Sequence, residues 1–427
     1  MKPGALSRRS FLMAAGATVA APLVVPARAL GREAGVPAAS ERLAMGFIGC
    51  GGMGRANYGA FRADQRVEVV GLADPDGEHL REMGETVRGN YGEGVQLVKD
   101  FRELLGRPDI DAVCIAVPDH WHALIAIAAM KAGKDVYCEK PLALTIAEGR
   151  AIAECVKRHA RVLQVGTQQR SGPDFRRACE LVRNGVLGEL RRVVVGIPAG
   201  PPESGPVAFI PPPPHLDYDL WLGPAPYEPY AVERLHWNFR WNYDYSGGMV
   251  TDWGAHHIDI AQWALGKDAS GPVLAQGTAT FPQSGIYNTP MTYSFRLEYE
   301  DAAPVEASSE PANGVRFEGE KGWIFVDRQK IEAEPANLLS ATFGPGDIRL
   351  PVSPGHQRNF VDCIFSRAEP IVPAETGHRS ITACHLANIS MRLGRPVRWD
   401  PAREIFPGDD EANRWISRPM RAPWRLG

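Results

Sequence analysis

A glycine-rich hexapeptide near the start of the chain has the spacing of a dinucleotide-binding turn. Residues 49–54 match G-x-G-x-x-G, and Asp74 follows Gly54 by 20 residues. Such a turn brings the backbone close to a pyrophosphate, and the later carboxylate hydrogen-bonds the adenosine ribose and repels a 2′-phosphate. We therefore expect NAD, with Arg55 keeping NADP open; the alternative is a glycine turn of no function. The expected contacts here are Gly49, Gly51, Gly52, Met53, Gly54 and Asp74.

Apolar segments alternate with helical ones around this turn. Short apolar runs at residues 44–48, 67–73, 112–117 and 135–138 are typical of parallel strands that are buried on both faces. The alternation predicts a doubly wound parallel sheet, whose ligands bind beyond the carboxyl ends of the strands. The residues that follow those ends, and that we expect beside the cofactor, include Pro118, His122, Glu139 and Lys140.

Two further motifs resemble those of a known oxidoreductase family. Glu139-Lys140-Pro141 is similar to the E-K-P motif of the Gfo/Idh/MocA family, and residues 246–259 resemble its G-G-x-x-x-D-x-G-x-H-x-x-D motif. The resemblance covers about residues 43–400. It implies an α/β protein with an N-terminal Rossmann domain (residues 43–165) and a C-terminal α+β domain with an open, mostly antiparallel sheet (residues 166–400). It also implies a homo-oligomer, a dimer or tetramer, with contacts through that sheet.

The resemblance assigns a catalytic set of Lys140, Asp252 and His256. On a helix, Asp252 and His256 would share one face within hydrogen-bonding reach. His256 would take the proton of a substrate hydroxyl, Asp252 would orient its ring, and Lys140 would hydrogen-bond the reacting oxygen. The alternatives are a solvated turn residue for Lys140 and a core histidine for His256. A metal site formed by the acids and histidines of residues 252–259 is set aside, because the family that the chain resembles shows no need for a metal.

Residues 235–245 are dense in aromatic and amide side chains. Sugars offer apolar ring faces for stacking and many hydroxyl groups, and this segment supplies partners for both. A packing plug beneath a proline-rich loop is an equal alternative, and both roles can coexist. Tyr243 or Tyr245 could serve as an additional acid or base. The expected substrate-binding residues are Arg170, His236, Trp237, Arg240, Trp241, Asn242 and Tyr243.

The N-terminus resembles a twin-arginine export signal. Residues 7–12 read Ser-Arg-Arg-Ser-Phe-Leu, an apolar stretch extends to Val25, and Ala27-Arg28-Ala29 has the A-x-A cleavage pattern. The stretch is too short and too rich in Ala and Gly to span a membrane. We expect a cleaved signal (residues 1–29), a periplasmic or other extracytoplasmic location, export in the folded state and no stable membrane insertion. The alternatives are retention as an anchor and a chance pair of arginines.

Composition excludes several other classes. The net charge of −3 and the lack of a long basic run argue against nucleic acid as a partner. Seven cysteines without C-x-x-C spacing predict neither a disulfide framework nor a cysteine zinc site.

The second domain has its own predicted elements. Strands are expected at 190–195, 274–281, 292–299, 315–318 and 323–326, and helices at 357–366 and 376–393, before an irregular tail (401–427) anchored by Trp415 and Trp424.

These features predict an enzyme that transfers a hydride between a sugar or polyol hydroxyl and NAD. Because there is no free NAD pool outside the cytoplasm, an exported enzyme must keep its cofactor bound and regenerate it in place. A redox-neutral NAD-dependent glycosidase, acting through a 3-keto intermediate, is the first alternative. A non-catalytic sugar-binding protein is a lesser alternative, against which the intact catalytic set argues.

Overall fold

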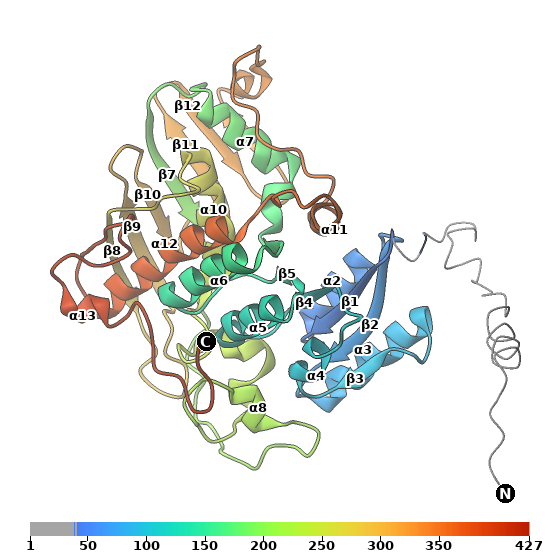
Figure 1. The fold of residues 1–427 in the computed structure, drawn as a ribbon. Coiled ribbons are helices and arrows are strands. Elements are labelled where there is room, and N and C mark those ends of the chain that lie inside the picture. Colours follow the sequence, from blue (N-terminus) through green and yellow to red (C-terminus); the bar gives the residue numbers. More distant parts are fainter. Residues whose placement is uncertain (1–37, 39–40, 427) are drawn as a thin grey trace, which may run out of the picture.

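Two sheets, each flanked by helices, organise the chain, as the computed structural model shows for residues 38 and 41–426 (Figure 1). The expected export signal lies outside the described residues. Among the described residues, no helix is long and apolar enough to cross a membrane.

The first sheet has six parallel strands in the order β3-β2-β1-β4-β5-β6. This order and the alternating helices confirm the predicted doubly wound dinucleotide-binding fold. Its strands are β1 (Leu43–Ile48), β2 (Val67–Ala73), β3 (Gln96–Val98), β4 (Ala112–Ile115), β5 (Asp135–Cys138) and β6 (Leu163–Val165). Its helices are α2 (Gly52–Phe61), α3 (Gly77–Tyr91), α4 (Phe101–Leu105), α5 (Asp119–Lys131) and α6 (Ile146–His159).

The second sheet has eight strands in the order β13-β12-β11-β7-β10-β9-β8-β14. Only the β7–β10 pair is parallel, so the predicted, mostly antiparallel sheet is confirmed. Its strands are β7 (Leu190–Gly196), β8 (Leu274–Thr280), β9 (Thr292–Glu298), β10 (Val305–Ser308), β11 (Gly314–Gly319), β12 (Gly322–Val326), β13 (Ile331–Glu334) and β14 (Val397–Arg398). Burial alternates along β9, as expected for a sheet with one covered face.

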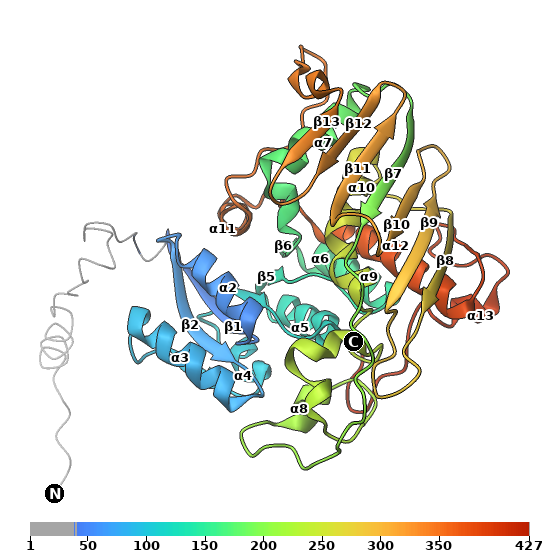
Figure 2. The same cartoon turned by 180° about the vertical axis from the view of Figure 1, so that it is seen from behind.

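Helices pack on one face of this sheet, and the other face stays open (Figure 2). The covering helices are α7 (Pro173–Arg183), α10 (Gly254–Leu265) and α12 (Ala374–Leu393). Helix α12 also packs on α6 of the first domain. Helix α11 (His356–Ser366) returns to the Rossmann core, where the Phe360 and Phe61 rings lie 6.0 Å apart. Two helices of the C-terminal half therefore fix the first sheet in place.

The long connection between β7 and α10 also reaches back to the Rossmann domain. It contains α8 (Tyr218–Leu222), the 3₁₀ helices η4 (Val232–Arg234) and η5 (His236–Trp241), and α9 (Met249–Asp252). The amide of Gly77 donates to the carbonyl of His215 (2.8 Å), and that of Asp217 donates to Pro75 (2.9 Å). These bonds place the aromatic segment beside the carboxyl end of β2.

The C-terminal residues run over the surface and contain a short helix, α13 (Asp410–Asn413). The guanidinium of Arg392 lies 3.9 Å from the ring centre of Trp415. Trp424 packs edge-on against Trp121, with ring centres 4.7 Å apart. Both tryptophans thus hold the tail against the two domains.

Candidate active site

A cleft of about 520 Å³ runs along the carboxyl edge of the first sheet. Its walls include the turns after β1, β2, β4 and β5, and the second domain contributes η5, the α9–α10 junction and Arg328. Clefts of this size at this edge are the usual ligand sites of doubly wound folds.

The glycine turn has the shape that a dinucleotide requires. Gly49 has a φ of +95°, and a Cβ there would lie 2.3 Å from the carbonyl oxygen of Ala116. A Cβ on Gly54 would lie 2.0 Å from the carbonyl oxygen of Gly49, whereas Gly52 has nothing within 4 Å among the described atoms. Helix α2 begins without a capping side chain or an acid in its first turn. Its free N–H groups can therefore receive a diphosphate.

Asp74 ties the glycine turn to the end of β2. Its two carboxylate oxygens accept hydrogen bonds from the amides of Cys50 (2.6 Å) and Asp76 (2.8 Å). Burial raises the pKa of Asp74 to about 6, against these hydrogen bonds, so the group is mostly ionised at neutral pH. The carboxylate lines the cleft near Gly51 and Met53, where it suits the ribose of NAD.

Lys140 and Asp252 join the two domains across the cleft. The Nζ atom of Lys140 lies 2.5 Å from Oδ1 and 3.0 Å from the backbone oxygen of Asp252. The Nε atom of Arg240 lies 3.3 Å from the same Oδ1 atom. Burial disfavours the charge on Asp252, but Lys140 and Arg240 outweigh it and lower its pKa. The carboxylate is therefore held ionised.

His256 lies one turn further along, at the start of α10. The expected hydrogen bond from the His256 ring to the Asp252 carboxylate is absent among the described residues, because Lys140 and Arg240 hold that carboxylate. The Nδ1 atom of His256 is buried without a hydrogen-bond partner in the described part of the chain. Burial, and then the charges of Lys140 and Arg328, lower the pKa of His256 well below its usual value. The ring is thus neutral at neutral pH and has a lone pair that can accept a proton.

The other residues expected beside the cofactor separate into two groups. Pro118, Glu139 and Met53 line the cleft, and Glu139 accepts hydrogen bonds from Asn57 (2.9 Å) and Gln168 (3.2 Å). His122 does not line it: its ring nitrogens face the carbonyls of Pro141 (2.6 Å) and Val117 (2.9 Å). The predicted cofactor contact is corrected, because His122 instead holds two loops of the cleft together.

Arg170 does not reach the cleft. It is 3% exposed and forms a two-pronged hydrogen bond with Asp259 (2.7 and 2.8 Å) and an ion pair with Asp268 (2.7 Å). The predicted substrate contact is therefore corrected: Arg170 joins η3 (Gln168–Ser171) to α10. A buried guanidinium needs carboxylate partners, and both partners come from distant parts of the sequence.

The aromatic segment divides between the cleft and the core. His236, Trp237 and Arg240 line the cleft, and the guanidinium of Arg240 stacks 4.1 Å from the ring centre of Trp237. The next three residues do not line the cleft, so their predicted role as substrate contacts is corrected. Packing or backbone contacts away from the cleft hold Trp241, Asn242 and Tyr243.

Tyr243 illustrates this packing. Its hydroxyl donates to Asn388 (3.3 Å), and Arg392 stacks 4.0 Å from its ring centre. Tyr245 is fully buried in a small aromatic core. Burial raises the pKa of both phenols, and neither side chain lines the cleft.

Arg328 and Asp119 are among the cleft residues that were missed from the sequence. Arg328, in the turn between β12 and β13, stacks 4.5 Å from the ring centre of Trp253. Asp119 begins α5, and its Oδ2 atom accepts a hydrogen bond from Ser246 (2.5 Å). Burial raises the pKa of Asp119 to about 7. Asp119 could have been found, since it directly follows Pro118; nothing local marks Arg328.

Comparisons with known proteins agree with this geometry. Residues 43–167 match the family model described as "Oxidoreductase family, NAD-binding Rossmann fold", and residues 204–426 match "Oxidoreductase family, C-terminal alpha/beta domain". The chain therefore belongs to the Gfo/Idh/MocA family and is an NAD-binding oxidoreductase.

Individual relatives act on different molecules. Myo-inositol 2-dehydrogenase of Thermotoga maritima is 27% identical over 294 residues, which cover 66% of this chain and 75% of the relative. Glycosyl hydrolase family 109 protein 1 of Shewanella sp. (strain ANA-3) is 33% identical over 204 residues, 43% of this chain and 44% of its own. The crystal structure of aldose-aldose oxidoreductase from Caulobacter crescentus has a TM-score of 0.63 at 23% identity, over 84% of this chain and 99% of that one.

Asp74 should make cofactor choice depend on pH. Its pKa of about 6 predicts that the carboxylate is charged above pH 7 and mostly neutral at pH 5. Repulsion of a 2′-phosphate should then weaken, and the ratio of the Kd for NADP to that for NAD should fall by roughly tenfold between pH 8 and pH 5. Titration of tryptophan fluorescence with each nucleotide measures both constants. In Asp74→Asn this Kd ratio should already be small at pH 8 and should fall less between pH 8 and pH 5. An equal fall of the ratio in the wild type and in Asp74→Asn would contradict the role of Asp74.

Arg170→Met should destabilise the protein without changing substrate affinity. The substitution leaves the buried Asp259 carboxylate with Ser380 as its remaining side-chain hydrogen-bond partner in the described part of the chain, which should cost about 3–5 kcal/mol of unfolding free energy. Arg358→Met is the matched control, because it breaks an exposed pair with Asp362 and should cost less than about 1 kcal/mol. Urea unfolding gives both values. If Arg170→Met were stable and had a raised KM, the structural role would be wrong and the predicted substrate contact of Arg170 would be right.

Proposed function

We propose that the protein oxidises a hydroxyl group of a sugar or polyol and transfers the hydride to NAD. The observation that carries this proposal is the meeting of Lys140, Asp252 and His256 in the cleft that begins at the glycine turn. A lysine, a carboxylate and a neutral imidazole are the groups that removal of a hydride and a proton from one CH–OH unit requires. NAD, when bound, supplies the hydride acceptor.

The polar residues divide the remaining work. Lys140 donates a hydrogen bond to the reacting oxygen and stabilises the negative charge that develops as its proton leaves. His256, whose ring is neutral and whose Nδ1 atom has no hydrogen-bond partner among the described residues, accepts that proton. Asp252 positions the Lys140 ammonium group, and Arg240 balances its charge. The proton therefore has a defined destination while the hydride leaves carbon.

The substrate side of the cleft suits a ring with many hydroxyl groups. Trp237 is 63% exposed and offers an aromatic face, while Arg240 beside it offers N–H donors. Arg328 and Trp253 form a second stacked pair that lines the cleft. The inositol dehydrogenase among the relatives acts on a polyol, which supports the same substrate class.

We further propose that NAD stays bound between turnovers. The sequence resemblance to an export signal supports this, since a folded protein would carry its cofactor out of the cytoplasm. Denaturing the purified mature protein and assaying the supernatant for NAD(H) tests it: near-stoichiometric nucleotide is expected. A protein that is empty but binds added NAD would instead be an ordinary dehydrogenase with a dissociable cofactor.

Lys140→Met should greatly slow turnover and keep NAD binding. Loss of the ammonium donor should lower kcat by roughly 10²–10³-fold, measured as NADH formation on a panel of sugars and polyols. Lys131→Met, on the exposed end of α5, is the matched control and should leave kcat unchanged. Full activity in Lys140→Met would overturn the proposal.

A redox-neutral glycosidase is the second candidate, and Asp119 favours it. Hydride removal at C3 would acidify the C2 hydrogen, elimination would break the glycosidic bond, water would add, and the hydride would return. Elimination needs an acid for the leaving oxygen, and the carboxyl of Asp119 lies in the cleft with a pKa of about 7. The similarity to a glycosyl hydrolase family 109 protein supports this reading.

Asp119→Asn separates the two candidates. For a glycosidase, the acid form of Asp119 is present below its pKa, so release of methanol from methyl glycosides, whose leaving oxygen needs an acid, should fall as the pH rises through about 7. The variant should lose this limb of the profile and most of the rate. A dehydrogenase should release no methanol, and its NADH formation should survive the substitution.

A further inference from the structure

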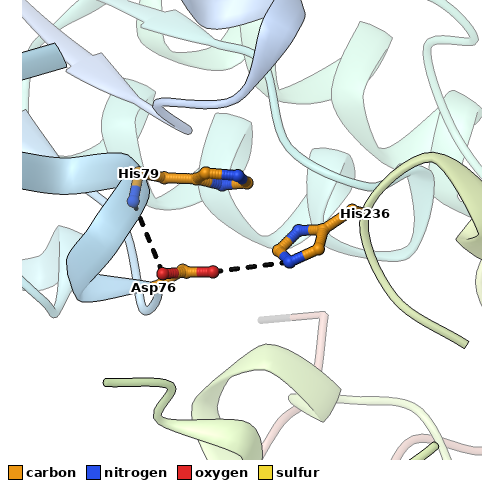
Figure 3. Close-up of side chains that lie close together, drawn as sticks. All are labelled: Asp76, His79 and His236. Atoms are coloured by element: carbon orange, nitrogen blue, oxygen red, sulfur yellow. Dashed lines mark hydrogen bonds and ion pairs between the residues drawn. The ribbon is translucent and has the colours of Figure 1, made fainter. Parts of the chain in front are cut away.

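Three metal-ligating side chains converge at one end of the cleft, outside the proposed catalytic set. Asp76 caps α3, His79 lies in the first turn of that helix, and His236 begins η5 of the second domain. One ligand atom from each lies within 4.8 Å of the other two. Figure 3 shows the carboxylate and the two rings gathered around a common space.

The spacing suits a metal ion better than a hydrogen bond. The Nε2 atom of His236 lies 3.5 Å from Oδ2 of Asp76, beyond the usual 2.7–3.2 Å of an N–H···O hydrogen bond. Two ligand atoms on a tetrahedral zinc, each about 2.0–2.1 Å from it, lie about 3.3 Å apart. The His79 and His236 rings are close as well, with centres 4.5 Å apart. Small side-chain rotations would thus bring all three ligand atoms to zinc distances.

Neighbouring contacts prepare each ligand. Oδ1 of Asp76 accepts hydrogen bonds from the amides of Glu78 (2.9 Å) and His79 (3.4 Å), which leaves Oδ2 to face His236. His236 has a φ of +52°, an unfavourable conformation for a residue with a side chain. Hydrogen bonds between residues 75–77 and 215–217 hold the two domains together beside it.

We propose that Asp76, His79 and His236 bind one zinc ion. Two imidazoles and a carboxylate are a donor set that zinc prefers, with the fourth position open for water. All three side chains line the cleft, so the ion would face the cofactor end, two residues from Asp74. It would fasten η5 to α3 and slow the release of NAD. Ligands separated by 157 positions in the sequence explain why no motif announced this site.

Zinc binding to the nucleotide-free mature protein tests the proposal without substrate or turnover. After the metal is stripped with a chelator, titration against a chromophoric zinc indicator should give one ion per chain. His79→Ala and His236→Ala should each weaken binding at least 100-fold. Asp76→Asn, which keeps the helix cap, should weaken it at least 10-fold. His159→Ala, at the far end of α6, is the control and should bind as the wild type does.

Two further measurements make the outcome decisive. Circular dichroism should show that all four variants are folded, and X-ray absorption at the zinc edge should show imidazole nitrogen and carboxylate oxygen ligands. Absent binding in the wild type, or unchanged binding in the folded His79→Ala and His236→Ala proteins, would overturn the site. Because none of these readouts uses hydride transfer, they remain valid if the oxidoreductase proposal fails on its sugar panel.

Discussion

The ion pair between Lys140 and Asp252 is the constraint on which the site depends. Each side chain is nearly buried, at 12% and 10% exposure, and a buried charge without a partner would be strongly destabilising. Lys140 comes from the carboxyl edge of the Rossmann sheet and Asp252 from the end of α9, so neither domain can complete the pair alone. The same contact that satisfies both charges places a lysine donor where the cofactor cleft meets the second domain.

Burial and the surrounding cations, rather than Asp252, set the state of His256. A carboxylate hydrogen-bonded to the imidazole would raise the pKa of the ring and favour its protonated form. Here Lys140 and Arg240 hold the carboxylate. Burial, and then the positive charges of Lys140 and Arg328, lower the pKa of the ring. The cleft therefore keeps a neutral base beside an ionised carboxylate. The four-residue spacing of Asp252 and His256 suggested that they act as a hydrogen-bonded dyad. In the structure they have separate roles, since Asp252 pairs with Lys140 and His256 is left as a neutral base.

Local sequence patterns predicted the parts of this protein that depend on local structure. The glycine turn and the strands at 44–48 and 112–117 were found because their geometry is set by neighbouring residues. The short strands β3, β10, β13 and β14 were missed, since pairing across the sheet stabilises them rather than their own pattern. Arg170 was assigned to substrate because its ion-pair partners lie 89 residues or more away. Arg328 reaches the cleft only through the fold of the second sheet.

The aromatic segment shows why a residue pattern can be right about chemistry and wrong about position. Residues 236–241 form a 3₁₀ helix, in which side chains three apart lie on the same side. Trp237 and Arg240 therefore stack together in the cleft, while Trp241, one step further, turns into the core. The two predicted roles of this segment, stacking on a sugar and packing in the core, thus belong to different sides of one short helix. Because the composition of a segment is the same whatever its helical period, only the structure could divide these residues between substrate and core.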